Sequence, residues 1–152
     1  MDYAIVDAAH SADTAAVLRR YAATGRAWSL FARQPESPHA DAGPWLIQLN
    51  EDQALHQWLF NLEVLPGVVC RFICAEDADD VVAHLQSRME LQLQDGNRAL
   101  FRFWDGRALY RMWGVMTWAQ RAAFIAPFTR WSARLQDRNW ELDHATMEKL
   151  WC

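Results

Sequence analysis

Two cysteines and a histidine are the side chains of this sequence best suited to nucleophilic chemistry. Cys70 and Cys74 lie in one apolar run, and His84 follows ten residues after the second cysteine. A thiolate that is activated by an imidazole and oriented by a carboxylate, such as Asp7 or Asp105, can attack an acyl group. A small cytoplasmic hydrolase that uses Cys74, His84 and Asp105 is therefore one function open to this chain.

The spacing of the same cysteines argues against a disulfide or a metal site. If residues 67–75 form a strand, Cys70 and Cys74 share one face but lie about 13 Å apart, at roughly 3.3 Å per residue. A disulfide needs Cα atoms within about 7 Å. No pair of cysteines has the C-x-x-C spacing typical of zinc sites. We expect buried free thiols in a reducing compartment, with no metal and no cofactor.

Residues 98–113 hold the densest run of arginines and aromatic side chains, which on a strand can stack nucleic acid bases. The chain has a net charge of −4, so no general positive field attracts phosphates. With a period of two, Phe101 and Phe103 face the core, while Leu100, Arg102 and Trp104 face the other side. Asp105 would then cap the next helix. The run is predicted to be structural, and no nucleic acid partner is expected.

Length and composition indicate one folded domain. The chain has 152 residues, of which 52% are hydrophobic, too many for a disordered acidic segment. The N-terminus lacks a basic region followed by a long apolar stretch, so we expect no secretory signal peptide. No run of about 18 apolar residues is free of charge, so no membrane span is expected. These features predict a cytoplasmic protein.

Alternating apolar runs predict the strands that must position these residues. Strands are expected at residues 3–7, 27–32, 45–49 and 67–75, in a hairpin of 89–93 with 99–104, and in a pair of 128–135 with 139–142. Helices are expected from Ser11 to 23, from Asn50 to 62, and at 76–85, 109–113, 118–125 and 145–151. This order predicts a single α/β or α+β domain over residues 1–152, with helices packed on a mixed β-sheet.

Three segments, in this order, resemble the motifs of one family. They are YAIVDAAH near the N-terminus, GPWLIQL in the middle, and LFRFWDGRAL, which is the most specific. The family is that of the bacterial type VI secretion effector adaptors, or effector chaperones (Tap/Tec type), catalogued as a domain of unknown function. The resemblance covers residues 3–135, followed by a C-terminal hairpin and helix over 128–152. The family often has proline where this chain has Gly106, and many members carry a further C-terminal lobe that we expect this single-lobe chain to lack.

The resemblance implies a non-enzymatic cytoplasmic protein that holds a secreted effector toxin and helps load it onto the VgrG spike. It also implies that the motif positions Asp7, Arg102, Asp105 and Arg107 are structural, at strand ends and a helix start. A toxin-binding immunity protein, which would block a toxin instead of delivering it, is an alternative beside the hydrolase.

Tryptophans crowd the last 40 residues and predict the partner surface, because tryptophan dominates interface hot spots. In the tail, Met147, Leu150 and Trp151 share one helical face, which either docks on the chain's own sheet or joins Trp140 in binding the partner. The predicted partner-binding residues are Trp113, Trp118, Trp140, Met147, Leu150 and Trp151.

Overall fold

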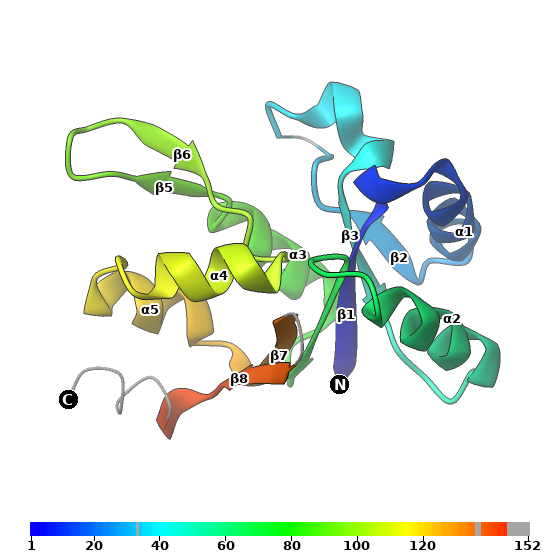
Figure 1. Cartoon of the computed structure of the whole chain (residues 1–152). Helices are drawn as coiled ribbons and strands as arrows, with labels where there is room; N and C mark the ends of the chain where they lie inside the picture. Colours follow the sequence, from blue (N-terminus) through cyan, green and yellow to red (C-terminus); the bar gives the residue numbers. More distant parts are fainter. Residues whose placement is uncertain (33, 136–137, 146–152) are drawn as a thin grey trace.

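The computed structural model describes residues 1–32, 34–135 and 138–145, which form an antiparallel sheet with helices on both faces (Figure 1). The sheet has the order β2-β3-β1-β4-β7-β8. Its strands are β1 (Asp2–Asp7), β2 (Ala27–Ser29), β3 (Pro44–Gln48), β4 (Val69–Cys74), β7 (Phe128–Leu135) and β8 (Arg138–Leu142). The helices are α1 (Ala12–Ala23), α2 (Gln53–Glu63), α3 (Ala78–Ser87), α4 (Gly106–Trp113) and α5 (Trp118–Ile125), with short 3-10 turns η1 (Ala8–His10) and η2 (Ser37–Ala42).

The α+β class is confirmed, but a mixed sheet was the wrong expectation. Every pair of neighbouring strands in the six-stranded sheet runs antiparallel. Strands that alternate with helices usually cross over and pair in parallel. Here the strands joined through α1 (β1 and β2) and those joined through α2 (β3 and β4) do run in the same direction, but they are not neighbours. One strand lies between the members of each pair, β3 in the first and β1 in the second, and it runs antiparallel to both.

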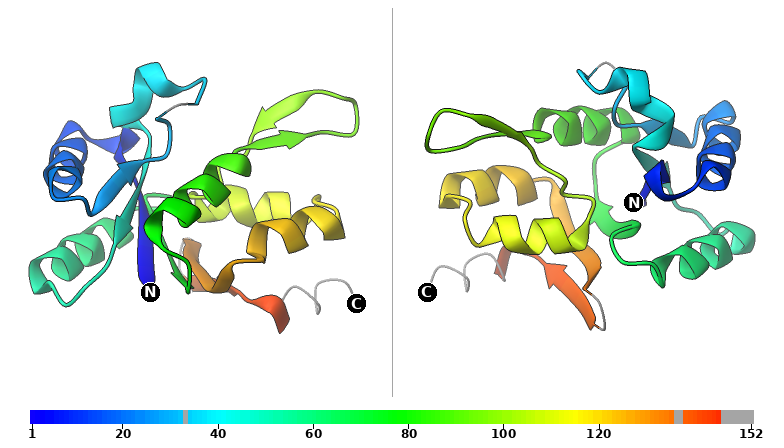
Figure 2. Two further views of the ribbon diagram at one scale, coloured as in Figure 1. Left: turned by 180° about the vertical axis from the view of Figure 1, so that it is seen from behind. Right: turned by 45° about the horizontal axis from the view of Figure 1, so that its top comes forward.

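Alternate residues of β1 face two separate cores, and this explains why the strand is buried almost throughout. Tyr3 and Ile5 belong to the larger core under α3, α4 and α5, whereas Ala4 and Val6 belong to the smaller core under α1 and α2. Figure 2 shows these two groups of helices on opposite sides of the sheet. A strand covered on both faces needs apolar residues at successive positions, as this one has.

Aromatic rings fill the larger core and hold α5 against β4 and β7. Trp131 stacks on Phe72 with ring centroids 4.9 Å apart, and Phe124 of α5 lies 5.1 Å from the same tryptophan. Phe103 packs against both Phe124 and Trp131. Aromatic pairs at such distances add favourable energy to the area they bury. These ring contacts fix the position of α5 and therefore of the residues at its N-terminal end.

The Asp-Gly hairpin forms as expected but stays apart from the main sheet. Strands β5 (Glu90–Gln92) and β6 (Arg98–Leu100) pair only with each other among the described residues, and the hairpin projects from the body of the molecule (Figure 1). The strand expected to continue to residue 104 ends at Leu100. The chain then turns inward, so that Trp104, expected on the outer face, is buried with 2% of its surface exposed.

Local sequence signals predicted one helix cap and the C-terminal strand pair correctly, but they misplaced another helix cap. Ser11 caps α1 as predicted, and its Oγ accepts a hydrogen bond from the backbone N–H of Asp13. The cap of α2 is Asp52 and not Asn50, because the Asn50 side chain instead accepts a hydrogen bond from the Asp52 N–H. The predicted strand pair near the C-terminus is confirmed as β7 and β8.

No described helix is both long enough and apolar enough to cross a membrane.

Candidate functional site

Two of the four motif residues, Asp7 and Arg102, meet where β1 ends. The Oδ1 atom of Asp7 accepts a hydrogen bond from the backbone N–H of Ala9 at 2.9 Å and so caps η1. The Oδ2 atom of Asp7 lies 3.7 Å from Nη2 of Arg102. The arginine side chain is 54% exposed, so water screens this pair and its energy is small. Its effect is to connect the first strand with the segment that leads into α4.

The other two motif residues, Asp105 and Arg107, form a tighter pair at the start of α4. Asp105 Oδ1 accepts hydrogen bonds from the backbone N–H of Arg107 at 3.0 Å and from its Nε at 3.1 Å, while Nη2 donates to Oδ2 at 2.9 Å. Burial by itself would raise the pKa of Asp105. The hydrogen bonds and charge of Arg107, together with the charge of Arg102, outweigh burial and lower that pKa below its ordinary value. Asp105 is therefore a charged helix cap, with both oxygens engaged.

Two glycines allow this cluster to pack closely. Gly67 has a φ of +76°, and a Cβ on it would come within 2.8 Å of the Asp105 carboxylate. A Cβ on Gly106 would come within 2.6 Å of the Cβ of Ala133, so the first turn of α4 rests directly on β7. Glycine at this position thus matches the close approach to Ala133.

The structure brings Asp7 to the other three motif residues, which lie close together in sequence, because Arg102 acts on the carboxylates of both Asp7 and Asp105. Each carboxylate caps a turn or helix, and each arginine interacts with a carboxylate. This arrangement positions α4 on the sheet.

The geometry around the cysteines is poorly suited to nucleophilic catalysis. Cys70 and Cys74 are both buried free thiols, and burial raises the pKa of each. The Nε2 atom of His84 lies 2.9 Å from the carbonyl oxygen of Phe124. Because a carbonyl can only accept a hydrogen bond, Nε2 carries the proton and donates it there. Burial lowers the pKa of this histidine. Both carboxylate oxygens of Asp105 are taken by Arg107. In the described parts of the chain, no three His, Cys, Asp or Glu side chains are grouped so that they could hold a metal ion.

A family model described as a domain of unknown function, DUF4123, matches residues 3–123. The chain belongs to the DUF4123 family. This is the family of type VI secretion effector adaptors that the three sequence motifs resemble. The match ends within α5, whereas the resemblance was expected to continue to residue 135. No curated protein and no solved structure matches the chain significantly.

The three predicted partner-binding residues of this DUF4123 chain that the structure describes differ in their exposure. Trp113 is buried with 2% exposed and was wrongly placed at the surface; its ring packs against Phe124 and its carbonyl accepts a hydrogen bond from Nε of Arg121. Trp118, at the start of α5, is 49% exposed. Trp140 of β8 is half-buried, with its ring 5.1 Å from that of Tyr110. The remaining three predicted residues, Met147, Leu150 and Trp151, lie outside the described residues.

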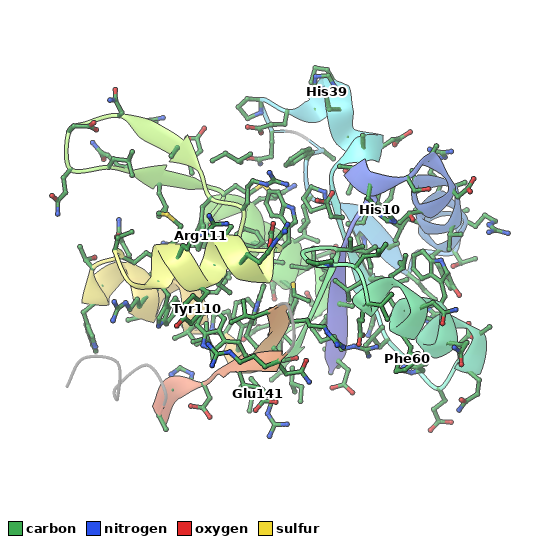
Figure 3. All side chains as sticks on the ribbon, viewed as in Figure 1. His10, His39, Phe60, Tyr110, Arg111 and Glu141 are labelled. Atoms are coloured by element: carbon green, nitrogen blue, oxygen red, sulfur yellow. The ribbon has the colours of Figure 1, made fainter. Side chains whose placement is uncertain are left out.

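Three exposed apolar side chains lie on α4, α5 and the loop between them, and we call these residues the corner surface. Its members are Tyr110, Val115 and Trp118, which are 47%, 70% and 49% exposed. Figure 3 labels Tyr110 on the side of α4 that faces β8. Of these three residues, only Trp118 was predicted from the sequence to bind a partner. Met116 in the same loop is buried in the core, so the local sequence alone does not distinguish the exposed Val115 from it.

Proposed function

We propose that this chain is a non-enzymatic cytoplasmic adaptor of a type VI secretion system, which binds one secreted effector toxin and helps load it onto VgrG. The observation that carries the proposal is the DUF4123 match over residues 3–123. The segment that resembles the family most specifically, residues 100–109, supplies the cap and ion pair that orient α4. In this proposal the family motif builds a scaffold that presents the corner surface to the effector.

The corner surface supports binding of a protein partner. Tryptophan and tyrosine offer large contact areas and lose few rotamers on binding, which makes them the usual anchors of interfaces. Trp118 and Tyr110 are both about half exposed, and they lie on two short helices that the aromatic core holds in place. A rigid platform lowers the entropic cost of association.

The two alternatives predict different outcomes. A hydrolase needs a thiolate near neutral pH, whereas burial favours the neutral thiol of Cys74. An immunity protein would bind the same toxin but abolish its activity, whereas an adaptor would leave the toxin active and be required for its secretion.

The test is to co-express the chain with the toxin encoded beside its gene and to measure co-purification, toxin activity and secretion. Trp118→Ala is expected to weaken co-purification at least tenfold. Phe60→Ala is the matched control, because Phe60 is 64% exposed on α2, away from the corner surface (Figure 3), and should bind as the wild type does. Loss of toxin activity on binding would favour an immunity protein. Failure of the wild-type chain to bind the toxin would refute the proposal.

A further inference from the structure

A groove lies between the projecting hairpin and the helices α4 and α5, and Val115 of the corner surface is part of its lining. It has a volume of about 850 Å³. Its lining comes from β5 and the following turn on one side, and from the end of α4, the α4–α5 loop and the start of α5 on the other, with no residue of β6. Strand β5 accordingly forms the wall of the hairpin nearer to α4 and α5 (Figure 1).

The edge of β5 that faces away from β6 has free backbone groups. The hairpin bonds that flank the strand join Met89 to Phe101 and Leu93 to Asn97. In an antiparallel pair such bonds involve alternate residues, so the N–H and C=O groups of Glu90 and Gln92 point away from β6. These groups have no protein partner in the described part of the chain. An open edge of this kind can pair with an extended segment of another protein.

The floor of the groove is apolar and adaptable. Leu91 of β5 and Leu93, which directly follows the strand, both line the groove, and Leu93 is 39% exposed. Met112 and Met116 lie opposite them, with Val115 of the loop 70% exposed. Methionine side chains adjust to different partners because they are unbranched and polarizable. The groove thus fits a strand that has apolar side chains at alternate positions.

Arg88 supplies a charge in a small cavity next to the groove. The small cavity of about 40 Å³ is lined by Arg88 and shares Leu91, Met116 and Gln120 with the groove. The Nε atom of Arg88 is buried without a hydrogen-bond partner, and no carboxylate in the described residues forms an ion pair with this side chain. A buried donor without an acceptor costs free energy, which a carboxylate from a binding partner would recover.

We propose that this groove binds an extended segment of the effector, which adds to β5 as a third strand of the hairpin. The segment pairs with the free groups of Glu90 and Gln92 and places alternate apolar side chains on Leu91, Met112 and Met116. An Asp or Glu side chain of the same segment pairs with Arg88. The identity of the partner rests on the proposed adaptor function, whereas the recognition chemistry comes from the groove itself.

The test uses acetylated and amidated ten-residue peptides that tile the effector encoded beside this chain, with binding measured by fluorescence anisotropy. Peptides that bind should combine one acidic residue with alternating apolar residues. Arg88→Gln should weaken their binding about 10- to 100-fold, as expected for loss of a charge-assisted hydrogen bond. Replacing the acidic residue of the peptide by its amide should cost the same factor, and the two changes together should cost no more than either alone.

A pair of proline variants tests the strand pairing. Gln92→Pro removes an N–H that faces the groove, whereas Arg98→Pro removes the equivalent N–H on the outer edge of β6; neither N–H bonds within the hairpin. Gln92→Pro should abolish peptide binding, while Arg98→Pro should retain it, with melting temperatures showing that both variants fold.

The possible results test the proposed groove and the proposed adaptor function separately. Equal effects of the two proline variants, or unchanged binding by Arg88→Gln, would overturn the proposed groove. Loss of binding in Arg88→Gln but not in Gln92→Pro would indicate a helical segment and would also overturn it. If the full effector co-purifies with wild type, Arg88→Gln and Gln92→Pro alike, the adaptor proposal stands and the groove proposal fails. If the effector does not bind the wild-type chain, both fail.

Discussion

Replacing Gly106 by alanine should destabilise the protein, although alanine favours helices. Gly106 is the first residue of α4, and an added Cβ would lie 2.6 Å from the Cβ of Ala133 and 3.2 Å from the carbonyl oxygen of Arg134. Two methyl carbons in contact lie about 3.5–4.0 Å apart. The first turn of α4 would therefore have to move away from β7 by about 1 Å.

The size of the effect follows from two opposing contributions. Alanine in place of glycine gains at most about 1 kcal/mol of helix propensity. Forcing an extra carbon into a packed core costs about 1–3 kcal/mol. Because the movement would also disturb the cap and ion pair of Asp105, we expect the upper part of that range and a net loss of about 1–2 kcal/mol.

Urea unfolding, followed by the fluorescence of the nine tryptophans, measures this loss. Gly114→Ala is the matched control, because a Cβ there would lie 3.6 Å from its nearest neighbour, an ordinary contact. It should leave stability unchanged or slightly higher. Ala133→Gly should make room for the new methyl group, so the double variant should be more stable by about 1–2 kcal/mol than the sum of the single effects.

An unchanged or increased stability of Gly106→Ala would contradict this reasoning. So would a double variant whose loss equals the sum of the two single losses, because the two sites would then act independently.

Two further predictions concern titratable groups. Since the pKa of Asp105 is lowered in the folded state, its stabilising contribution is present above the unfolded pKa of about 3.9 and is lost as the pH falls through the folded value. Asp105→Asn should cost about 1–2 kcal/mol at pH 7, and its difference in melting temperature from the wild type should shrink between pH 5 and pH 3; a constant difference would contradict the pair with Arg107. In a Cys152→Ser background, Cys70 and Cys74 should react with Ellman's reagent at pH 7.5 only on unfolding, because both thiols are buried and their pKa values raised. Rapid reaction of folded Cys74 would instead favour the hydrolase.

Local chemistry predicted many elements correctly because the deciding interactions are short in sequence. The cap at Ser11, the hairpin turn at Gly96 with its φ of +86°, and the pairing of β7 with β8 all depend on residues close together in the chain. The cap of α2 was misplaced by two residues, since Asn50 and Asp52 are both good caps. The choice between them depends on which side chain accepts the hydrogen bonds from the backbone N–H groups of the first helical turn.

Local sequence patterns could not predict which tryptophans are buried in the core. Trp113 and Trp118 are similar in sequence context, yet one packs on Phe124 and the other is half exposed. The period-two pattern placed Trp104 outside because it assumed that the strand continues beyond Leu100. The chain instead turns inward there, since the aromatic core offers more apolar burial than the hairpin does.

The sequence by itself determined the family, the α+β class, and most of the helices and strands, because motifs, caps and periodicity are properties of neighbouring residues. Only the tertiary structure decided that the sheet is antiparallel throughout, that Asp7, Arg102, Asp105 and Arg107 form one cluster, and which tryptophans reach the surface. It alone revealed the groove beside β5 and the unpartnered Nε of Arg88. These features arise where distant segments pack together, and the free energy of that packing depends on shape and burial, which no local pattern contains.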